Sequence, residues 1–214
     1  MGGKYHHGDL RAELVRASLD LIAEQGLGGF SVAEVARRAK VSPGAPYRHF
    51  QDRESLLAEI ACTVACQLTD RVRVAAGTHA DPVEALAAAA GAYTAYLIER
   101  RAGMHVVFAA GLQGPEYAKL HDQTRQLTDE FLMLCLTVSA GPPEALELLE
   151  QLFTQAHGYG TFYLDGVFAK QGYSTELVVR KSTEAARIVI EAHGNLAGNA
   201  AGDGIAGAAT DVAS

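Results

Sequence analysis

The sequence is poor in cysteine, and its three cysteines do not make a disulfide framework. They are Cys62, Cys66 and Cys135, in a chain of 214 residues. Cys62 and Cys66 are four residues apart and share one face of an expected helix, which is the wrong spacing for a Cys-x-x-Cys redox or zinc motif. We interpret all three as small buried apolar residues. A thiol sensor at Cys62 and Cys66 is the alternative interpretation.

Long apolar runs are also absent. No segment reaches the roughly 18 residues that a membrane span needs, and the alanine-rich stretch 85–92 is bounded by Glu84 and Tyr93. The first ten residues, MGGKYHHGDL, contain no apolar signal-peptide core and no myristoylation motif. We therefore expect a cytoplasmic protein that has no membrane partner.

The motifs of common enzyme classes are missing as well. No glycine-rich loop follows a strand pattern, and no nucleophile-elbow pattern occurs. Neither His-x-x-x-His nor Cys-x-x-Cys is present, so the sequence offers no recognisable metal site. We predict that the protein is not an enzyme and has no catalytic residues, no metal site and no cofactor.

What the sequence does contain is helical periodicity. Hydrophobic residues make up 49% and charged residues 20% of the chain, which suits a globular protein of one or two domains. Apolar positions recur at helical spacing from residue 9 to residue 193, and no useful length shows the alternation of a strand. We predict an all-α fold of about nine helices, with a short polar arm at 1–8 and a disordered Gly/Ala-rich tail at 194–214.

The stretch 30–50, FSVAEVARRAKVSPGAPYRHF, organises the chain. Ser31 and Glu34 have the spacing of a capping box, which predicts the start of a helix. An apolar stripe then follows. Asp9, Asp52 and Asp81 are expected to cap other helices, and the last helix is expected to begin near Ser174. Ser42 is expected to cap a second short helix, with Pro43 at its first position. Two short helices joined by a tight turn make a helix-turn-helix, whose second helix enters a DNA major groove.

Charge supports this interpretation. The net charge is −7, but residues 1–60 hold eight basic and eight acidic side chains, so the acidic excess lies entirely in 61–214. Asp52 is the only acid between Val35 and Arg53. Basic groups beside helix N-termini are what phosphate binding needs. The competing interpretation is a solvated charged face on a helical hairpin.

The motifs SVAEVARRA, VSPG, YRHF and DRESLL, in this order, resemble the DNA-binding domain of the tetracycline-repressor (TetR) family of bacterial regulators. The resemblance covers roughly the first sixty residues. Two positions depart from the family pattern. Lys40 stands in the turn where Gly is frequent, and Pro46 stands where Leu or Ile is frequent. Because Pro46 cannot donate to the Ser42 carbonyl, we expect a short or tightened recognition helix at 42–49.

The resemblance implies a set of DNA contacts. Backbone and methyl contacts are expected from the start of the recognition helix, a phosphate or guanine contact from Arg48, and phosphate contacts from the remaining residues. The predicted DNA-binding residues are Ser31, Arg37, Ser42, Pro43, Gly44, Ala45, Tyr47, Arg48, His49 and Arg53.

For the rest of the chain the resemblance implies a helical bundle with a ligand pocket and a dimer interface on the last two long helices. His157-Gly158 followed by Gly166 is similar to a subfamily with a Trp-His-Gly motif, although Ala156 replaces the Trp. Gly158 and Gly160 indicate close approach of another helix, for which a partner subunit is a candidate, or a local break beside His157. The candidate ligand-binding residues, which could equally fill a core, are Tyr93, Tyr96, His105, Phe108, Phe131, Met133, His157 and Phe162.

Together these observations predict a DNA-binding head at 1–53, a regulatory and dimerisation domain at 54–193 and the tail at 194–214. The predicted function is a ligand-responsive homodimeric repressor that binds a palindromic DNA operator and is released by an apolar or aromatic small molecule. The alternative is a helical protein that binds small molecules or docks to proteins without binding DNA.

Overall fold

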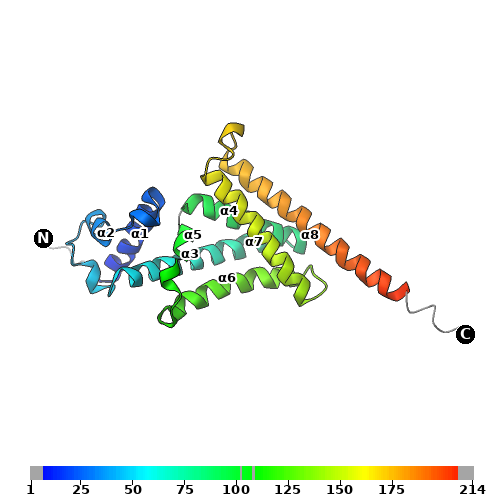
Figure 1. Ribbon diagram of the computed structural model, residues 1–214, viewed down its shortest axis with the longest axis horizontal. Coiled ribbons are helices and arrows are strands. Elements are labelled where there is room, and N and C mark those ends of the chain that lie inside the picture. Colours follow the sequence, from blue (N-terminus) through cyan, green and yellow to red (C-terminus); the bar gives the residue numbers. More distant parts are fainter. Residues whose placement is uncertain (1–6, 102, 108, 207–214) are drawn as a thin grey trace, which may run out of the picture. The chain divides into compact units, whose positions relative to one another are not determined.

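The computed structural model describes residues 7–101, 103–107 and 109–206, and these residues form helices and connecting turns without a strand (Figure 1). The all-α prediction is therefore confirmed, with eight α-helices among the described residues instead of about nine. The α-helices are α1 (His7–Gln25), α2 (Val32–Arg38), α3 (Arg53–Ala76), α4 (Pro82–Arg100), α5 (Gly103–Val107), α6 (Ala118–Leu136), α7 (Pro142–Leu164) and α8 (Thr175–Ala206). The 3-10 helices are η1 (Leu27–Gly29), η2 (Pro46–Arg48), η3 (Ala110–Leu112), η4 (Pro115–Tyr117) and η5 (Ala169–Gln171).

The chain divides into two compact units. The first comprises Met1–Leu68 and Glu99–Leu127, and the second comprises Thr69–Ile98 and Thr128–Ser214. Helices α3, α4 and α6 contribute residues to both units. Each unit therefore combines two separate segments of the chain, whereas the sequence analysis predicted two consecutive domains that meet after residue 53.

Arg11 links three segments of the first unit. In this unit α1 packs against α2 and α5, with Leu14 and Leu21 fully buried. The Arg11 guanidinium donates to the His49 carbonyl at 3.1 Å and to the Glu59 carboxylate of α3 at 2.8 Å. It also lies over the Phe50 ring, 4.6 Å from its centroid. One side chain of α1 thus holds the end of the turn that follows α2 onto the first half of α3.

Several helix starts follow their predicted caps. The Ser55 N–H donates to Asp52 Oδ1 at 2.7 Å and the Asp52 N–H donates to Ser55 Oγ at 3.1 Å, which is a reciprocal capping box. Asp81 accepts the Glu84 N–H at 3.0 Å at the start of α4. Ser174 accepts the Leu177 N–H at 3.2 Å at the start of α8.

Both ends of the described chain are more helical than the sequence predicts. Helix α1 begins at His7, ahead of the expected cap at Asp9, and the rest of the predicted arm lies outside the described residues. Helix α8 continues to Ala206, through part of the predicted disordered tail. Extending an existing helix adds hydrogen bonds without the cost of nucleation. Residues 207–214 lie outside the described chain.

Small residues bring three helices of the second unit together. Helices α7 and α8 lie side by side (Figure 1), and both meet α4. A Cβ at Gly160 of α7 would lie 2.2 Å from Leu97 Cδ2, and a Cβ at Gly91 of α4 would lie 2.1 Å from Thr183 Oγ1 of α8. The close approach predicted at Gly160 is therefore confirmed, and the approaching helix is α4 of the same chain.

A buried polar network crosses the same contact. The Thr94 hydroxyl donates to the Ala156 carbonyl at 3.0 Å and lies 2.7 Å from Ser182 Oγ. Gln155 Nε2 donates to the Ser182 carbonyl at 3.0 Å. Thr94 and Ser182 have no exposed area, so these bonds fix the register of α4, α7 and α8 in the interior.

Among the described residues, none of the helices combines the length and the hydrophobicity that a membrane-spanning helix requires.

Candidate nucleic-acid interface and effector site

Helix α2 ends in a turn that requires an unusual backbone conformation. Lys40 has φ 56°, and the Val41 N–H donates to the Ala36 carbonyl at 3.0 Å. This is the hydrogen bond of a Schellman motif, in which the left-handed position is usually Gly. Lys40 therefore occupies, at a conformational cost, the position where the related family often has Gly.

The predicted recognition helix at 42–49 is not an α-helix. Residues 46–48 form the 3-10 helix η2, and the Ala45 N–H donates to the Ser42 carbonyl at 2.9 Å. An α-helix would satisfy that carbonyl with the N–H of Pro46, which does not exist. The expected tightening is therefore confirmed, whereas an α-helix capped by Ser42 is wrong.

The surface of this segment is polar and accessible. Tyr47 is 55% exposed, and Ser42, Pro43, Gly44 and Arg48 are exposed as well. Ala45 is only 9% exposed and packs inward, so in this conformation its side chain is not presented for the predicted apolar contact with thymine methyl groups. The tight turn that satisfies the Ser42 carbonyl rotates Ala45 and Pro46 into the core.

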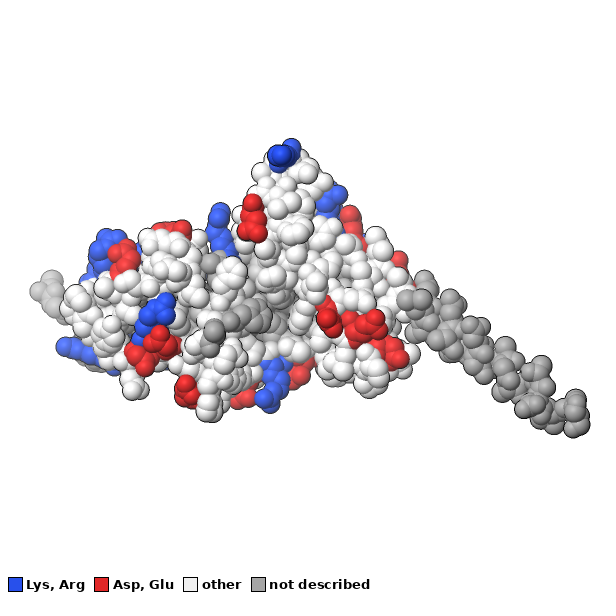
Figure 2. All heavy atoms as spheres, in the orientation of Figure 1, with Lys and Arg blue, Asp and Glu red and all other residues white. Residues whose placement is uncertain are grey.

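Arg48 and Arg53 present positive charge beside this segment. Arg48 has no ion-pair partner among the described residues. Arg53, at the start of α3, lies over the Phe30 ring, 5.5 Å from its centroid, and 3.4 Å from Glu54. Figure 2 shows basic and acidic side chains mixed over α1, α2 and the turn that follows, while acidic side chains gather over the first turns of α7. The exposed Arg48 guanidinium is thus a group to which a phosphate oxygen can bind.

The capping box expected at Ser31 and Glu34 does not form. Ser31 is the exposed N-cap of α2 but makes no side-chain cap bond. Glu34 instead accepts from Arg37 at 2.7 Å and from Arg38 at 3.2 Å. Arg37 binds both carboxylate oxygens of Glu34, and such a bidentate pair between opposite charges is among the strong hydrogen-bonded contacts. Arg37 above all, together with Arg38, lowers the pKa of Glu34 to about 2.

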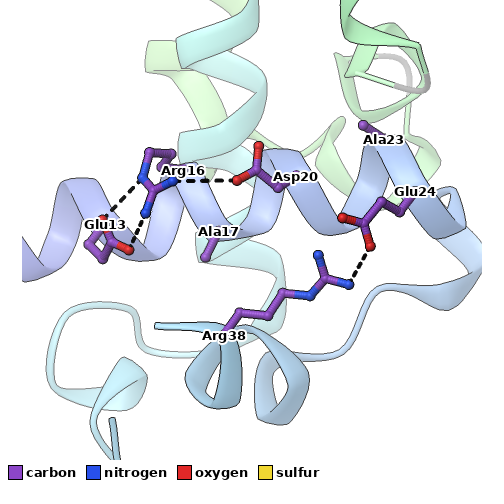
Figure 3. A pocket seen from close by; sticks show the side chains of 7 residues that line it. All are labelled: Glu13, Arg16, Ala17, Asp20, Ala23, Glu24 and Arg38. Atoms are coloured by element: carbon purple, nitrogen blue, oxygen red, sulfur yellow. Dashed lines mark hydrogen bonds and ion pairs between the residues drawn. The ribbon is translucent and has the colours of Figure 1, made fainter. Parts of the chain in front are cut away.

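Helices α1 and α2 are joined across a charged surface hollow of about 410 Å³ (Figure 3). Arg38 of α2 reaches Glu24 of α1 at 2.6 Å, which lowers the pKa of that carboxyl. On α1, Arg16 lies between Glu13 and Asp20 and pairs with both. The charges of the hollow are thus paired with one another, and they orient α2 rather than leaving a site open.

In the second unit, two of the predicted ligand residues meet at a hydrogen bond. The Tyr93 hydroxyl and His157 Nδ1 share a bond of 3.1 Å. Phe131 and Phe153 complete an aromatic cluster, with ring centroids 4.7 Å apart and Phe153 5.6 Å from Tyr93. Burial raises the pKa of Tyr93 to about 12. Phe153 was missed by the sequence analysis, although it stands four residues before His157 on the same helix face.

The other predicted ligand residues do not join this cluster. Tyr96 is buried, with the Arg71 guanidinium 5.3 Å from its ring centroid. Met133 and Phe162 are 65% and 53% exposed, so neither faces the interior. His105 is exposed and belongs to the first unit, and Phe108 lies outside the described residues. The helical periodicity of the sequence identified apolar residues, but it could not show which face of each helix packs against another helix.

A second hollow, of about 460 Å³, lies on the outer side of α7 and α8. The sequence analysis named only Phe162 among its side chains as a ligand candidate. Its lining residues are Thr154, Gln155, Gly158, Tyr159, Phe162, Phe168, Tyr173 and Lys181.

Comparison with known proteins links the helix-turn-helix part of the chain to bacterial transcriptional regulators. A family model described as bacterial regulatory proteins of the tetR family matches residues 14–60. The chain is 39% identical over 62 residues to the HTH-type transcriptional regulator BetI of Klebsiella pneumoniae (strain 342), a match that covers 29% of this chain and 32% of BetI. The similarity to the tetR family lies in residues 14–60, and the match spans about a third of the length of that curated relative.

Solved structures extend the similarity to the whole fold. A protein of unknown function from Rhodococcus sp. RHA1 superposes with a TM-score of 0.72 at 24% identity, covering 87% of this chain and 97% of that one. The regulator FadR of Bacillus subtilis, solved in complex with stearoyl-CoA, gives a TM-score of 0.62 at 16% identity and covers 82% and 96%. At these identities the two structures show a shared fold.

Proposed function

We propose that this protein is a ligand-responsive homodimeric repressor that binds a palindromic DNA operator and is released by a small molecule. The observation that carries the proposal is the segment 42–48, in which exposed Arg48 and Tyr47 lie beside the start of α3. The same segment lies inside the part of the chain that matches the family model.

Two kinds of contact are expected from this surface. Ser42, Pro43 and Gly44 are exposed and small, so the backbone can approach the floor of the groove closely, while Arg48 binds guanine or phosphate. The flanking DNA backbone is contacted by the remaining predicted residues that are at least partly exposed. These are Ser31, Arg37, Tyr47, His49 and Arg53. In a dimer, the two heads would read half-sites about 34–36 Å apart.

The second unit supplies features suited to dimerisation and to effector binding. Leu146, Phe162, Val167 and Ile188 are all about half exposed or more and lie on α7, α8 or their connection. Covering them with a second copy would remove apolar area from water. The Tyr93–His157 pair among aromatic rings offers a polar anchor in an apolar surrounding, which is the make-up of a small-molecule site. An effector releases DNA only if it binds better to the state with separated heads.

The test is selection of binding sites from a random duplex pool, followed by affinity measurement on the selected site at 50 and 200 mM salt. We expect a palindromic site and a loss of affinity of several orders of magnitude, because phosphate contacts release counterions. Arg48→Ala should weaken binding by tenfold or more. Arg180→Ala is the charge-matched control, because Arg180 is an exposed residue of α8. This variant should leave the affinity for DNA unchanged. Absence of any enriched site from a confirmed dimer would refute DNA recognition and favour a helical binding protein.

A further inference from the structure

Residues 42–50, which we call the recognition segment, are held at their far end by a side chain of α1. Arg11 Nη1 donates to the His49 carbonyl at 3.1 Å. The Arg11 guanidinium carbon also lies 4.6 Å from the centroid of the Phe50 ring, which is buried. Arg11 therefore holds two consecutive residues, one through a backbone hydrogen bond and the other through its ring.

Glu59 of α3 in turn orients Arg11. Its Oε2 atom accepts from Arg11 Nη2 at 2.8 Å and also lies 3.4 Å from Lys119 Nζ. Only 24% of the Glu59 side chain is exposed, so this ion pair is less screened than a pair on the open surface. A guanidinium presents its donors in a rigid, planar fork, which lets Arg11 bind the His49 carbonyl and the Glu59 carboxylate at once. All of these residues belong to the first unit.

The backbone of the recognition segment gives this end little stiffness of its own. The Arg48 N–H donates to the Ala45 carbonyl at 3.2 Å, and the next two N–H groups both donate to the Pro46 carbonyl at 2.9 Å. These are the bonds of a single turn, and 3-10 bonds have poorer geometry than those of an α-helix. Because a single helical turn is unstable by itself, the direction in which Arg48 points depends on the side chains that hold the turn.

We propose that Glu59 and Arg11 are positioning residues for DNA recognition. Glu59 orients the Arg11 guanidinium, Arg11 holds the end of the recognition segment, and the segment then presents Arg48 to the DNA. The part of this proposal that concerns DNA rests on the proposed function, whereas the hold on the segment is measured without DNA.

Removal of Glu59 is a sharp test, because charge and position predict opposite results. If charge alone matters, loss of an acidic group from the DNA-binding unit should strengthen DNA binding. If Glu59 orients Arg11, the same loss should weaken it. We expect Glu59→Met, which keeps the length of the side chain, to bind the selected duplex about tenfold more weakly than the wild type.

The charge-matched control is Asp122→Asn, at an exposed residue of the first unit. Its affinity for DNA should stay within about twofold of the wild type, because exposed charges are screened by salt. A Glu59→Met variant that binds DNA as tightly as the wild type, or more tightly, overturns the proposal.

Variants of Arg11 separate positioning from a direct phosphate contact. Arg11→Lys keeps the charge but loses the fork, and should bind DNA about tenfold more weakly. Arg16→Lys, at an exposed residue of the same helix, is the matched control and should bind as the wild type does. Arg11→Met should bind more weakly with an unchanged salt slope, whereas a slope smaller by about one would mean that Arg11 contacts a phosphate itself. That slope, or wild-type affinity in Arg11→Lys, overturns the proposal.

A double variant tests whether the two residues act in series. Arg11→Lys combined with Glu59→Met should bind DNA no more weakly than the weaker single variant, because both changes release the same turn. Losses that multiply would show two independent effects and overturn the series. Affinities refer to the folded fraction, measured by circular dichroism, so that a loss of stability alone does not count.

Amide hydrogen exchange without DNA, followed by mass spectrometry on a peptide that covers residues 46–50, measures the hold on the segment. We expect exchange to be at least about fivefold faster in Glu59→Met and Arg11→Lys, because the turn opens more often. The two control variants should exchange as the wild type does. A wild type that selects no DNA site would refute the proposed function, and the exchange rates would still decide whether these residues hold the segment. Unchanged rates overturn the proposal whatever the DNA result.

Discussion

Replacement of Gly158 or Gly160 of α7 by Ala should change the free energy of unfolding in opposite directions. Gly158 faces open space, whereas a Cβ at Gly160 would lie 2.2 Å from Leu97 Cδ2 and 3.1 Å from its Cγ. Gly158→Ala and Gly160→Ala make the same chemical change in the same helix. The difference between them therefore isolates the contact with α4.

The expected magnitudes follow from two effects. Replacing Gly by Ala inside a helix stabilises the folded chain by about 0.5–1 kcal/mol, because Gly loses more backbone entropy on folding. Gly158→Ala should show this gain alone. At Gly160 the same gain is opposed by an overpacking cost of about 1–3 kcal/mol, since Leu97 is buried and must move. The two variants should differ by that cost, about 1–3 kcal/mol, with Gly160→Ala the less stable.

Urea unfolding followed by circular dichroism at 222 nm, at one fixed protein concentration, measures both free energies. In thermal melts each kcal/mol should appear as a shift of about 2–4 °C for a chain of this size. A double-mutant cycle with Leu97→Ala assigns the cost, because truncating Leu97 should remove much of the penalty at Gly160 and none at Gly158. Equal effects of the two glycine substitutions would refute the close packing of α4 against α7.

Three further predictions concern backbone strain and titration. Lys40→Gly should leave the protein about 1 kcal/mol more stable than Lys40→Ala, because the left-handed conformation at φ 56° disfavours a Cβ; chemical denaturation of both variants measures the difference. Arg37 and Arg38 lower the pKa of Glu34 to about 2, so its stabilising contribution is complete above the unfolded pKa of about 4.3 and is lost as pH falls towards 2. Glu34→Gln should flatten the stability curve in that window, and an unchanged acid limb would contradict the ion pairs. Burial raises the pKa of Tyr93 to about 12, so the stability that its neutral form contributes is complete below about pH 10 and is lost as pH rises to 12. Tyr93→Phe should therefore remove one phenol that titrates near pH 12 from the ultraviolet difference spectrum.

The caps that were predicted correctly depend on residues close together in the sequence. Asp52, Asp81 and Ser174 each accept a backbone N–H three residues later, and nothing distant competes for them. The box at Ser31 fails because Glu34 has better partners in Arg37 and Arg38. The spacing was correct, but two guanidinium groups within one helical turn outcompete a backbone amide for the carboxylate.

The ligand residues were harder to predict because their placement depends on contacts between distant segments. Tyr93 and His157 were chosen from composition and helix period, and the fold brings them within hydrogen-bond distance. Met133 satisfies the same criteria but faces outward. The outer hollow depends on the connection between α7 and α8, where Phe168 and Tyr173 fall outside any helical stripe. No periodic pattern could therefore have grouped them with Lys181.

The segment proposed to read DNA is held by side chains from elsewhere in the first unit. An α-helical recognition element keeps its shape through its own backbone hydrogen bonds, but Pro46 removes one of these and leaves a 3-10 turn. The buried side chains of Ala45 and Pro46 hold this turn against the core of the first unit. Arg11 holds its far end through the His49 carbonyl and the Phe50 ring. Because Arg11 also pairs with Glu59 of α3, the orientation of the recognition segment is tied to the helix that leads into the second unit.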